Sequence, residues 1–203
     1  MISEEKRRFR DRANRNRLAL LKEKEQHGYI NDGSGKRYRA GVFFVLAGEN
    51  RKALEFFSWF ESEFPDDIGE PVFNLYWALA EYRNGNEEHA RYRLQHAMLS
   101  NLYMLPFLFG EPLGLLDICH SSNRDQSGYL WEVEEYLNEP TEKERQWIKQ
   151  EYNSTPFASL RDEYINTYRT LKYEHDFERR GALLRSWNQY ATRFFSHRQP
   201  SHK

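Results

Sequence analysis

Four sets of residues in the 203-residue chain have types and spacings that chemistry could use. The first is the segment 33–36, Gly-Ser-Gly-Lys, which has part of the pattern of a phosphate-binding loop. That loop requires a Gly five residues before the Gly-Lys pair and a Ser or Thr directly after it. Those two positions hold Ile30 and Arg37, and no buried strand precedes them. We therefore expect a turn that leads into a helix rather than a phosphate site.

The second and third sets contain histidine and cysteine. His89 and His96 lie seven residues apart and so share a helix face, but no Cys or carboxylate joins them at metal-ligand spacing. Cys119 and His120 are neighbours in sequence, which points their side chains in different directions. A nucleophile needs its base within hydrogen-bond reach. We therefore predict no catalytic residue, no metal site and no cofactor, and expect Cys119 to be a small buried thiol.

The fourth set consists of carboxylates in two clusters, Glu61/Glu63/Asp66/Asp67 and Glu132/Glu134/Glu135. Such clusters could bind a cation or take part in acid–base chemistry. Most charge runs of this kind are solvated helix faces, and neither cluster shows an environment that would perturb a pKa. We expect solvated faces at both places.

Charge is unevenly distributed along the chain. Residues 1–40 hold 12 Lys and Arg against 6 Asp and Glu, residues 41–160 hold 9 against 20, and residues 161–203 hold 9 against 5. A basic N-terminal helix could bind nucleic acid, or it could pack against the acidic middle of the same chain. The residues concerned are Lys6, Arg7, Arg8, Arg10, Arg12, Arg15 and Arg17.

The elements that must position these groups are predicted to be helices. Aromatic residues make up 16% of the chain, which supplies material for a core and excludes a wholly disordered protein. A single Cys excludes an intrachain disulfide scaffold and is consistent with a cytoplasmic location. The apolar runs at 41–48 and 103–109 are too short to span a membrane, and no secretory signal is seen.

Caps, glycines and prolines predict where the helices begin and end. The apolar segment 102–109 is interrupted by Pro106 and predicts an irregular or shortened helix. The expected helices otherwise cover residues 4–26, 37–47, 51–64, 72–84, 87–101, 111–118, 129–137, 142–152, 156–174 and 177–196.

The two helical hairpins between residues 36 and 102 resemble tetratricopeptide repeats. Equivalent small residues and glycines recur every 37 residues, from Gly48 to Gly85 and from Ala53 to Ala90. The first hairpin carries the motif residues Gly41, Phe44, Gly48, Ala53, Phe57 and Pro65, and the second carries Ala78, Gly85, Ala90, Leu94 and Ala97. The second departs from the motif at Glu81 and Leu102. The resemblance implies antiparallel helical hairpins whose concave face binds a peptide.

In family members that hold a C-terminal carboxylate, Lys and Asn line that face; here the matching places are apolar, so this clamp is absent. An apolar face could bind an amphipathic helix of a partner, or the chain's own terminal helices could cover it. The residues predicted to bind a partner are Tyr38, Val42, Val45, Leu75, Leu79, Tyr82 and Arg83.

The sequence therefore predicts an all-α protein in which tetratricopeptide-like hairpins are closed by extra N- and C-terminal helices. A single helical domain is expected over residues 1–203. It comprises a basic helix and loop (1–35), two hairpins (36–102), an irregular third unit (103–140) and C-terminal helices (141–203). The predicted function is a non-enzymatic adaptor that binds another protein or peptide and no membrane; the alternative is a nucleic-acid-associated protein that binds through the basic N-terminal helix.

Overall fold

The computed structural model describes residues 3–196, and these residues form ten α-helices and no strand. The prediction of an all-α fold is confirmed. The chain divides into two compact units, Met1–Arg93 (unit 1) and Leu94–Lys203 (unit 2). A single domain over residues 1–203 stays a prediction, and the polar tail after residue 196 lies outside the described residues.

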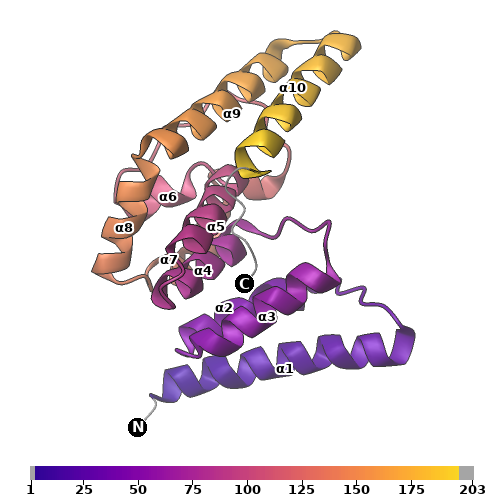
Figure 1. Cartoon of the computed structure of the whole chain (residues 1–203), viewed down its shortest axis with the longest axis vertical. Helices are drawn as coiled ribbons and strands as arrows, with labels where there is room; N and C mark the ends of the chain where they lie inside the picture. The colour runs from indigo at the N-terminus through magenta and orange to yellow at the C-terminus, as the bar shows by residue number, and fades with distance from the viewer. Residues whose placement is uncertain (1–2, 197–203) are drawn as a thin grey trace. The chain divides into compact units, whose positions relative to one another are not determined.

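Unit 1 is built from helices whose ends follow local signals in the sequence (Figure 1). The hydroxyl of Ser3 accepts a hydrogen bond from Lys6 N at 3.3 Å where the first helix begins. Gly28 ends that helix with a φ of 77°, a conformation that glycine adopts without strain. The helices are α1 (Glu4–His27), α2 (Lys36–Leu46), α3 (Asn50–Glu63), α4 (Pro71–Arg83) and the first part of α5 (Glu87–Ser100).

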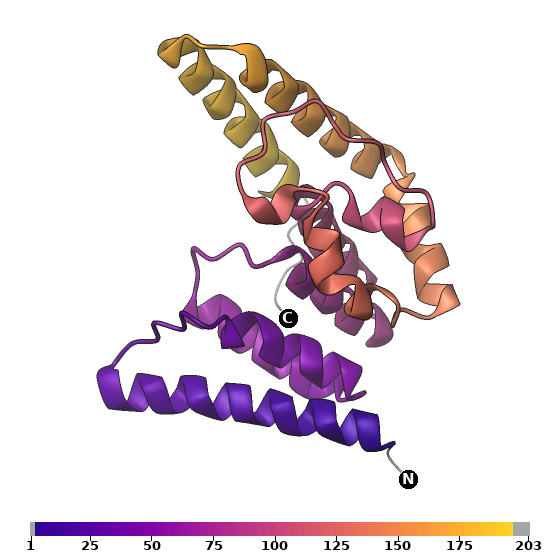
Figure 2. The ribbon, with the colours of Figure 1, turned by 180° about the vertical axis from the view of Figure 1, so that it is seen from behind.

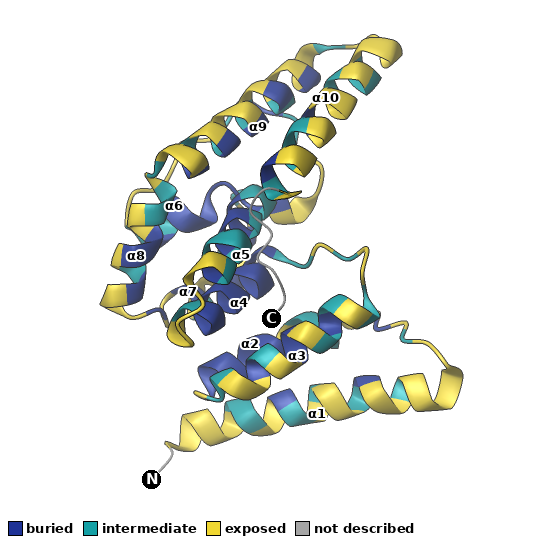
Figure 3. Cartoon of the chain, in the orientation of Figure 1, coloured by how far each residue is buried: buried dark blue, intermediate teal, exposed yellow. Residues whose placement is uncertain are grey.

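The long helix α1 covers α2. Ala13 and Leu20 are fully buried, and the ring of Phe9 lies 5.8 Å from that of Phe43. The guanidinium of Arg12 lies 4.3 Å from the centre of the Phe43 ring. The rest of α1 is largely exposed (Figure 3). Part of the basic helix is therefore used to complete the core of unit 1.

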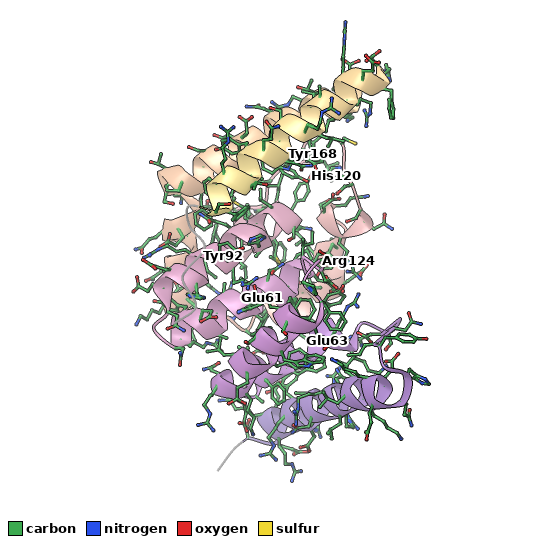
Figure 4. The ribbon with its side chains drawn as sticks, turned by 45° about the vertical axis from the view of Figure 1, so that its right-hand side comes forward. Glu61, Glu63, Tyr92, His120, Arg124 and Tyr168 are labelled. Carbon is green, nitrogen blue, oxygen red and sulfur yellow. The ribbon has the colours of Figure 1, made fainter. Side chains whose placement is uncertain are left out.

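The core of unit 1 is dominated by aromatic rings held at close range. A Cβ at position 41 would lie 2.8 Å from Cζ of Phe57, so Gly41 is the residue that lets α2 and α3 approach. The Phe57 ring stacks on Trp77 at 4.9 Å with an interplanar angle of 8°. The guanidinium of Arg93 lies 3.3 Å from the centre of the Trp77 ring and 2.5 Å from Glu61 Oε1, which Figure 4 labels. The Trp77 ring is therefore in contact with both Phe57 and Arg93.

Unit 2 combines short helices with one long antiparallel hairpin. Thr141 and Glu144 form the predicted capping box before the helix that starts at Glu142. The elements are the end of α5, α6 (Met104–Leu108), a 3-10 turn η1 (Asn123–Asp125), α7 (Tyr129–Leu137), α8 (Glu142–Tyr152), α9 (Thr155–Tyr173) and α10 (Phe177–Ser196).

The hairpin of α9 and α10 is closed by aromatic contacts. The rings of Tyr164 and Trp187 meet edge to face at 5.2 Å, and Phe194 is buried further along α10. Apolar spacing in the sequence predicts a buried stripe on α10 that includes Phe177, Leu184, Trp187 and Phe194. This prediction is wrong at its start, because Phe177 is 88% exposed and Leu184 is 39% exposed. Only the second half of α10 buries its apolar face.

The helix predicted for residues 111–118 does not form. The segment between α6 and η1 instead runs in an irregular conformation along α9 (Figure 2). Cys119 N donates to Tyr168 O at 2.9 Å, and the hydroxyl of Tyr173 donates to the Asp117 carboxylate, at 2.6 Å from its Oδ2. Contacts with residues distant in sequence therefore hold this segment in a non-helical conformation. Cys119 is half-buried rather than buried as predicted.

Candidate functional site

Most of the partner-binding residues expected from sequence lie inside the protein. Val42, Val45, Leu75 and Leu79 are buried, with at most 4% of each residue exposed. Tyr82 is half-buried and Arg83 is exposed at the end of α4. Partner binding by this set stays a prediction, and its four aliphatic members have no accessible side chain to offer.

Tyr38, the remaining member of that set, belongs to a polar network that fixes the start of α2. Its hydroxyl donates to Asp67 Oδ2 at 2.7 Å and accepts from Arg37 at 3.0 Å. The Arg37 Nε lies 3.1 Å from the same Asp67 oxygen. Burial and the hydrogen bond to Asp67 raise the pKa of Tyr38 above its ordinary value. These contacts give Tyr38 a structural task within unit 1.

A cavity in unit 2 offers a more accessible candidate site. It encloses about 260 Å³ between α6, the irregular segment that follows it and α7. Its walls are mainly apolar, and two exposed apolar residues stand out: Trp131 is 82% exposed and Leu113, at the other wall, is 36% exposed. The lining residues are Tyr103, Phe107, Pro112, Leu113, Ser127, Leu130, Trp131 and Glu134. We call this cavity and its walls the Trp131 groove.

The register of α7 determines why Trp131 points outward. The helix buries Tyr129, Val133 and Leu137, which recur every four residues along one face. Trp131 lies two residues after Tyr129, about 200° around the helix at 100° per residue, and so lies on the opposite side. Apolar spacing in the sequence predicts that Leu130, Val133 and Leu137 share one face of this helix. The structure buries Val133 and Leu137, but Leu130 is only half-buried and lines the groove.

Buried polar side chains hold the walls of the groove in place. Asn101 is fully buried; its Nδ2 donates to Arg124 O at 2.7 Å and to Gln126 O at 3.0 Å, and its Oδ1 accepts from Tyr103 N at 3.0 Å. The hydroxyl of Tyr103 accepts from Leu116 N at 3.0 Å. These bonds tie the segments before and after the groove to the start of α6, so its shape does not depend on a ligand.

The loop beside the groove has its own anchors. His120 Nε2 lies 3.3 Å from the hydroxyl of Tyr103, and Asp125 Oδ2 accepts from Ser121 N at 2.6 Å and from Ser122 N at 3.1 Å. Figure 4 labels His120, which follows Cys119 in the sequence, and Tyr168 on α9, whose carbonyl oxygen accepts the hydrogen bond from Cys119 N. Asp125 Oδ2 and His120 Nε2 therefore help to hold the conformation of this loop, whereas Asp125 Oδ1 is buried without a hydrogen-bond partner among the described residues.

Arg145 on α8 joins the two helices that form the groove. Its guanidinium donates to Leu108 O at the end of α6 and to Leu137 O at the end of α7, each at 2.8 Å. Its Nε also donates to Pro140 O at 3.0 Å. Carbonyls at a helix end lack intrahelical partners, and a cation is favoured there by the helix dipole. One side chain thus fixes α6 against α7.

The other groups with possible chemistry are occupied or isolated. The Asp32 carboxylate caps α2 by accepting from Lys36 N at 2.9 Å and from Arg37 N at 2.7 Å. The glycine-rich turn at 33–36 therefore leads into a helix whose first amides already have an acceptor. Within residues 3–196, no three His, Cys, Asp or Glu side chains gather in a way that could hold a metal ion.

Comparisons of the chain with protein-family models, with curated proteins and with solved structures gave no match. In the part of the chain that the structure describes, no helix combines the length and apolarity needed to cross a membrane. The functional argument therefore starts from the geometry of the Trp131 groove.

Proposed function

We propose that the protein is a non-enzymatic interaction module that binds a segment of another protein in the Trp131 groove. The observation that carries this proposal is an 82% exposed Trp131 beside an apolar cavity. Burial of apolar surface drives association, and tryptophan is enriched among residues that dominate binding energy. A partner side chain that filled the cavity would bury both its own surface and the indole.

The size of the groove favours a peptide side chain over a small-molecule ligand. Its volume of about 260 Å³ is below the roughly 300–1,000 Å³ of typical small-molecule sites. Its walls are also held by Asn101 and Arg145 through bonds to the backbone. Preorganised walls reduce the entropy lost on binding, which suits a surface that accepts one or two anchor side chains.

We also propose that the hairpins of unit 1 are tetratricopeptide-like and serve as a scaffold. The close approach of Gly41 to Phe57 supports this, because the motif places a small residue in the first helix where the second helix packs. The buried Leu75 and Leu79 favour the alternative in which the concave face is covered by the chain itself. We also propose a cytoplasmic location, which the single Cys supports.

Selection of a random peptide library against the full chain tests the interaction proposal. Selected peptides should bind the wild-type protein and lose at least about tenfold in affinity with Trp131→Ala, because an aromatic hot spot carries more than ~1.4 kcal/mol. Phe177→Ala is the matched control, since Phe177 is 88% exposed on α10 and lies outside the groove. Peptides that bind Trp131→Ala as well as the wild type would refute the proposal.

A second candidate function, nucleic-acid binding through α1, is favoured by cations that the fold leaves available. Arg7, Arg15 and Arg17 are exposed and form no ion pair with another described residue. Arg8, in contrast, pairs with Glu4 at 2.6 Å. Deleting α1 would uncover the core, so substitution of the three arginines by Gln is the better test. Binding to heparin or duplex DNA should weaken steeply with salt and be lost in this variant; salt-independent binding would exclude it.

A further inference from the structure

The Trp131 groove lies in a part of the chain with a strong excess of negative charge. Residues 94–142 hold eight Asp and Glu against a single Lys or Arg, which is Arg124. Every residue that lines the groove comes from within this stretch. The formal charge of the stretch is therefore −7, whereas the whole chain has a formal charge of −1.

Three of these carboxylates belong to α7 and have no counter-ion within residues 3–196. Glu132, Glu134 and Glu135 are exposed, and none of their side chains forms a hydrogen bond or ion pair with another residue in 3–196. Glu134 also lines the groove. Two other carboxylates of this stretch are engaged: Asp117 pairs with Lys172, and Glu111 pairs with Lys149. The helix that carries Trp131 thus presents three carboxylates that no described cation compensates.

An apolar cavity next to unpaired carboxylates defines the chemistry of its occupant. A side chain that fills the cavity must be apolar, because the walls offer mainly carbon. The partner residues on either side of that side chain would lie close to the carboxylates of α7. Asp or Glu at these positions would be repelled, whereas Lys or Arg would be attracted. Arg and aromatic residues are also enriched among interface anchors.

We propose that the groove binds a basic segment of a partner protein in which one bulky apolar residue is flanked by Lys or Arg. The apolar residue fills the cavity against Trp131, and the flanking cations pair with Glu132, Glu134 and Glu135. This inference rests on the proposed interaction function and adds the sign of the partner's charge. Affinity depends on salt, because the carboxylates are exposed and screened by mobile ions.

Three peptide libraries that share the same apolar positions test the inference. Their flanking positions are all Lys or Arg, all Ser or Gln, or all Asp or Glu. Each library is bound to the full chain at about 50 mM and about 300 mM salt, concentrations across which screening changes strongly. The basic library should bind best, and its advantage should shrink at the higher concentration.

A triple variant, Glu132→Gln with Glu134→Gln and Glu135→Gln, identifies the carboxylates. Exposed ion pairs are worth ~0.2–1 kcal/mol each, so we expect about tenfold weaker binding of the basic peptides. The matched control is Asp162→Asn with Glu163→Gln and Glu178→Gln, which removes three exposed carboxylates of α9 and α10 outside the groove. This control should leave binding unchanged.

The possible outcomes distinguish failure of the charge preference from failure of the proposed interaction function. Trp131-dependent binding without preference for basic peptides would overturn the inference and leave the interaction function standing. Absence of any Trp131-dependent binding would overturn both. Salt-sensitive self-association that requires Trp131 would show that a second copy is the occupant, and would also overturn the inference.

Discussion

The two units contain cavities of the same volume, but the aromatic side chains that line them differ in exposure. The cavity of unit 1 also encloses about 260 Å³ and lies between α1, α2 and α3. Its aromatic rings pack on one another: Phe56 lies 5.2 Å from Trp59 and 6.4 Å from Phe44. Two of its charged residues are paired, with Lys52 2.9 Å from Glu49 and Glu55 3.6 Å from Arg51. Most of the aromatic and charged side chains of this cavity therefore already have a partner within unit 1.

The Trp131 groove is the contrasting case. Its Trp is 82% exposed and the carboxylates beside it have no counter-ion among the described residues. The two cavities cannot be distinguished by size, so the difference lies in which side chains remain without a partner inside the chain. The cavity of unit 1 uses its aromatic residues for packing, whereas the Trp131 groove leaves its indole exposed. Stability measurements on the one and binding measurements on the other can test this contrast.

The largest expected effect is the loss of an aromatic ring from the core of unit 1. Phe57 is fully buried, packs against Gly41 and stacks on Trp77. Phe57→Ala should lower the free energy of unfolding by about 3–5 kcal/mol, because the ring leaves a cavity and deprives Trp77 of its stacking partner. Urea denaturation measures the change. A loss below ~1 kcal/mol would contradict the account of unit 1 as a tightly packed aromatic core.

The next effect concerns the side chain that joins α6 to α7 in unit 2. Arg145→Met removes the donors to Leu108 O, Leu137 O and Pro140 O while keeping much of the aliphatic stem. We expect a loss of about 2–3 kcal/mol in the free energy of unfolding, since half-buried carbonyls lose a charged donor. Arg145→Lys should recover only part of it, because an ammonium cannot reproduce the planar fork. Full recovery by Lys would show that charge alone matters.

Alkaline pH should destabilise the protein through its buried tyrosines. Burial raises the pKa of Tyr164 far above its ordinary value of 10.0, and the neighbouring Tyr168 is raised for the same reason. Above pH 10 the unfolded chain releases these protons while the folded chain retains them, so stability is complete below pH 10 and falls as pH rises.

The fall should have a measurable slope. Tyr164→Phe should reduce it by up to ~1.4 kcal/mol per pH unit between pH 10 and about pH 12, because one titrating group is removed. Denaturation at a series of pH values checks this. An unchanged slope in the Phe variant would show that Tyr164 ionises as readily in the folded protein as in the unfolded chain.

Local signals in the sequence were sufficient to locate most of the helices. The capping box of Thr141 and Glu144 and the left-handed Gly28 act within one helical turn, so they are visible without the fold. The helix expected at 111–118 does not form, because the backbone of this segment makes hydrogen bonds with residues distant in sequence. Leu116 N bonds to Tyr103 and Cys119 N bonds to α9, and neither partner can be identified from neighbouring residues.

The candidate site was harder to predict than the fold. Apolar residues such as Leu75 and Leu79 fit a binding face and a core equally well, and the structure buries them. Trp131, however, does carry a signal in the sequence. It is a large apolar residue out of register with the stripe of Tyr129 and Val133, and acidic residues follow it. An apolar residue on the polar face of an amphipathic helix therefore indicates an exposed binding position.

The smallest expected effect on stability is that of Trp131→Ala, and comparing it with Trp59→Ala distinguishes the two cavities most clearly. Trp131→Ala should change the free energy of unfolding by less than about 0.5 kcal/mol, because the side chain is 82% exposed. Trp59→Ala in unit 1 should cost about 2 kcal/mol, less than a fully buried ring, since Trp59 is half-buried against Phe56 and Phe64.

Peptide binding should show the reverse order. Trp131→Ala should weaken it at least about tenfold, whereas Trp59→Ala should leave it intact in the folded protein. Denaturation and binding measured on the same two variants provide the comparison. If Trp131→Ala were as destabilising as Trp59→Ala, the exposed indole would be part of a packed core, and the distinction between an occupied cavity and an available groove would no longer hold.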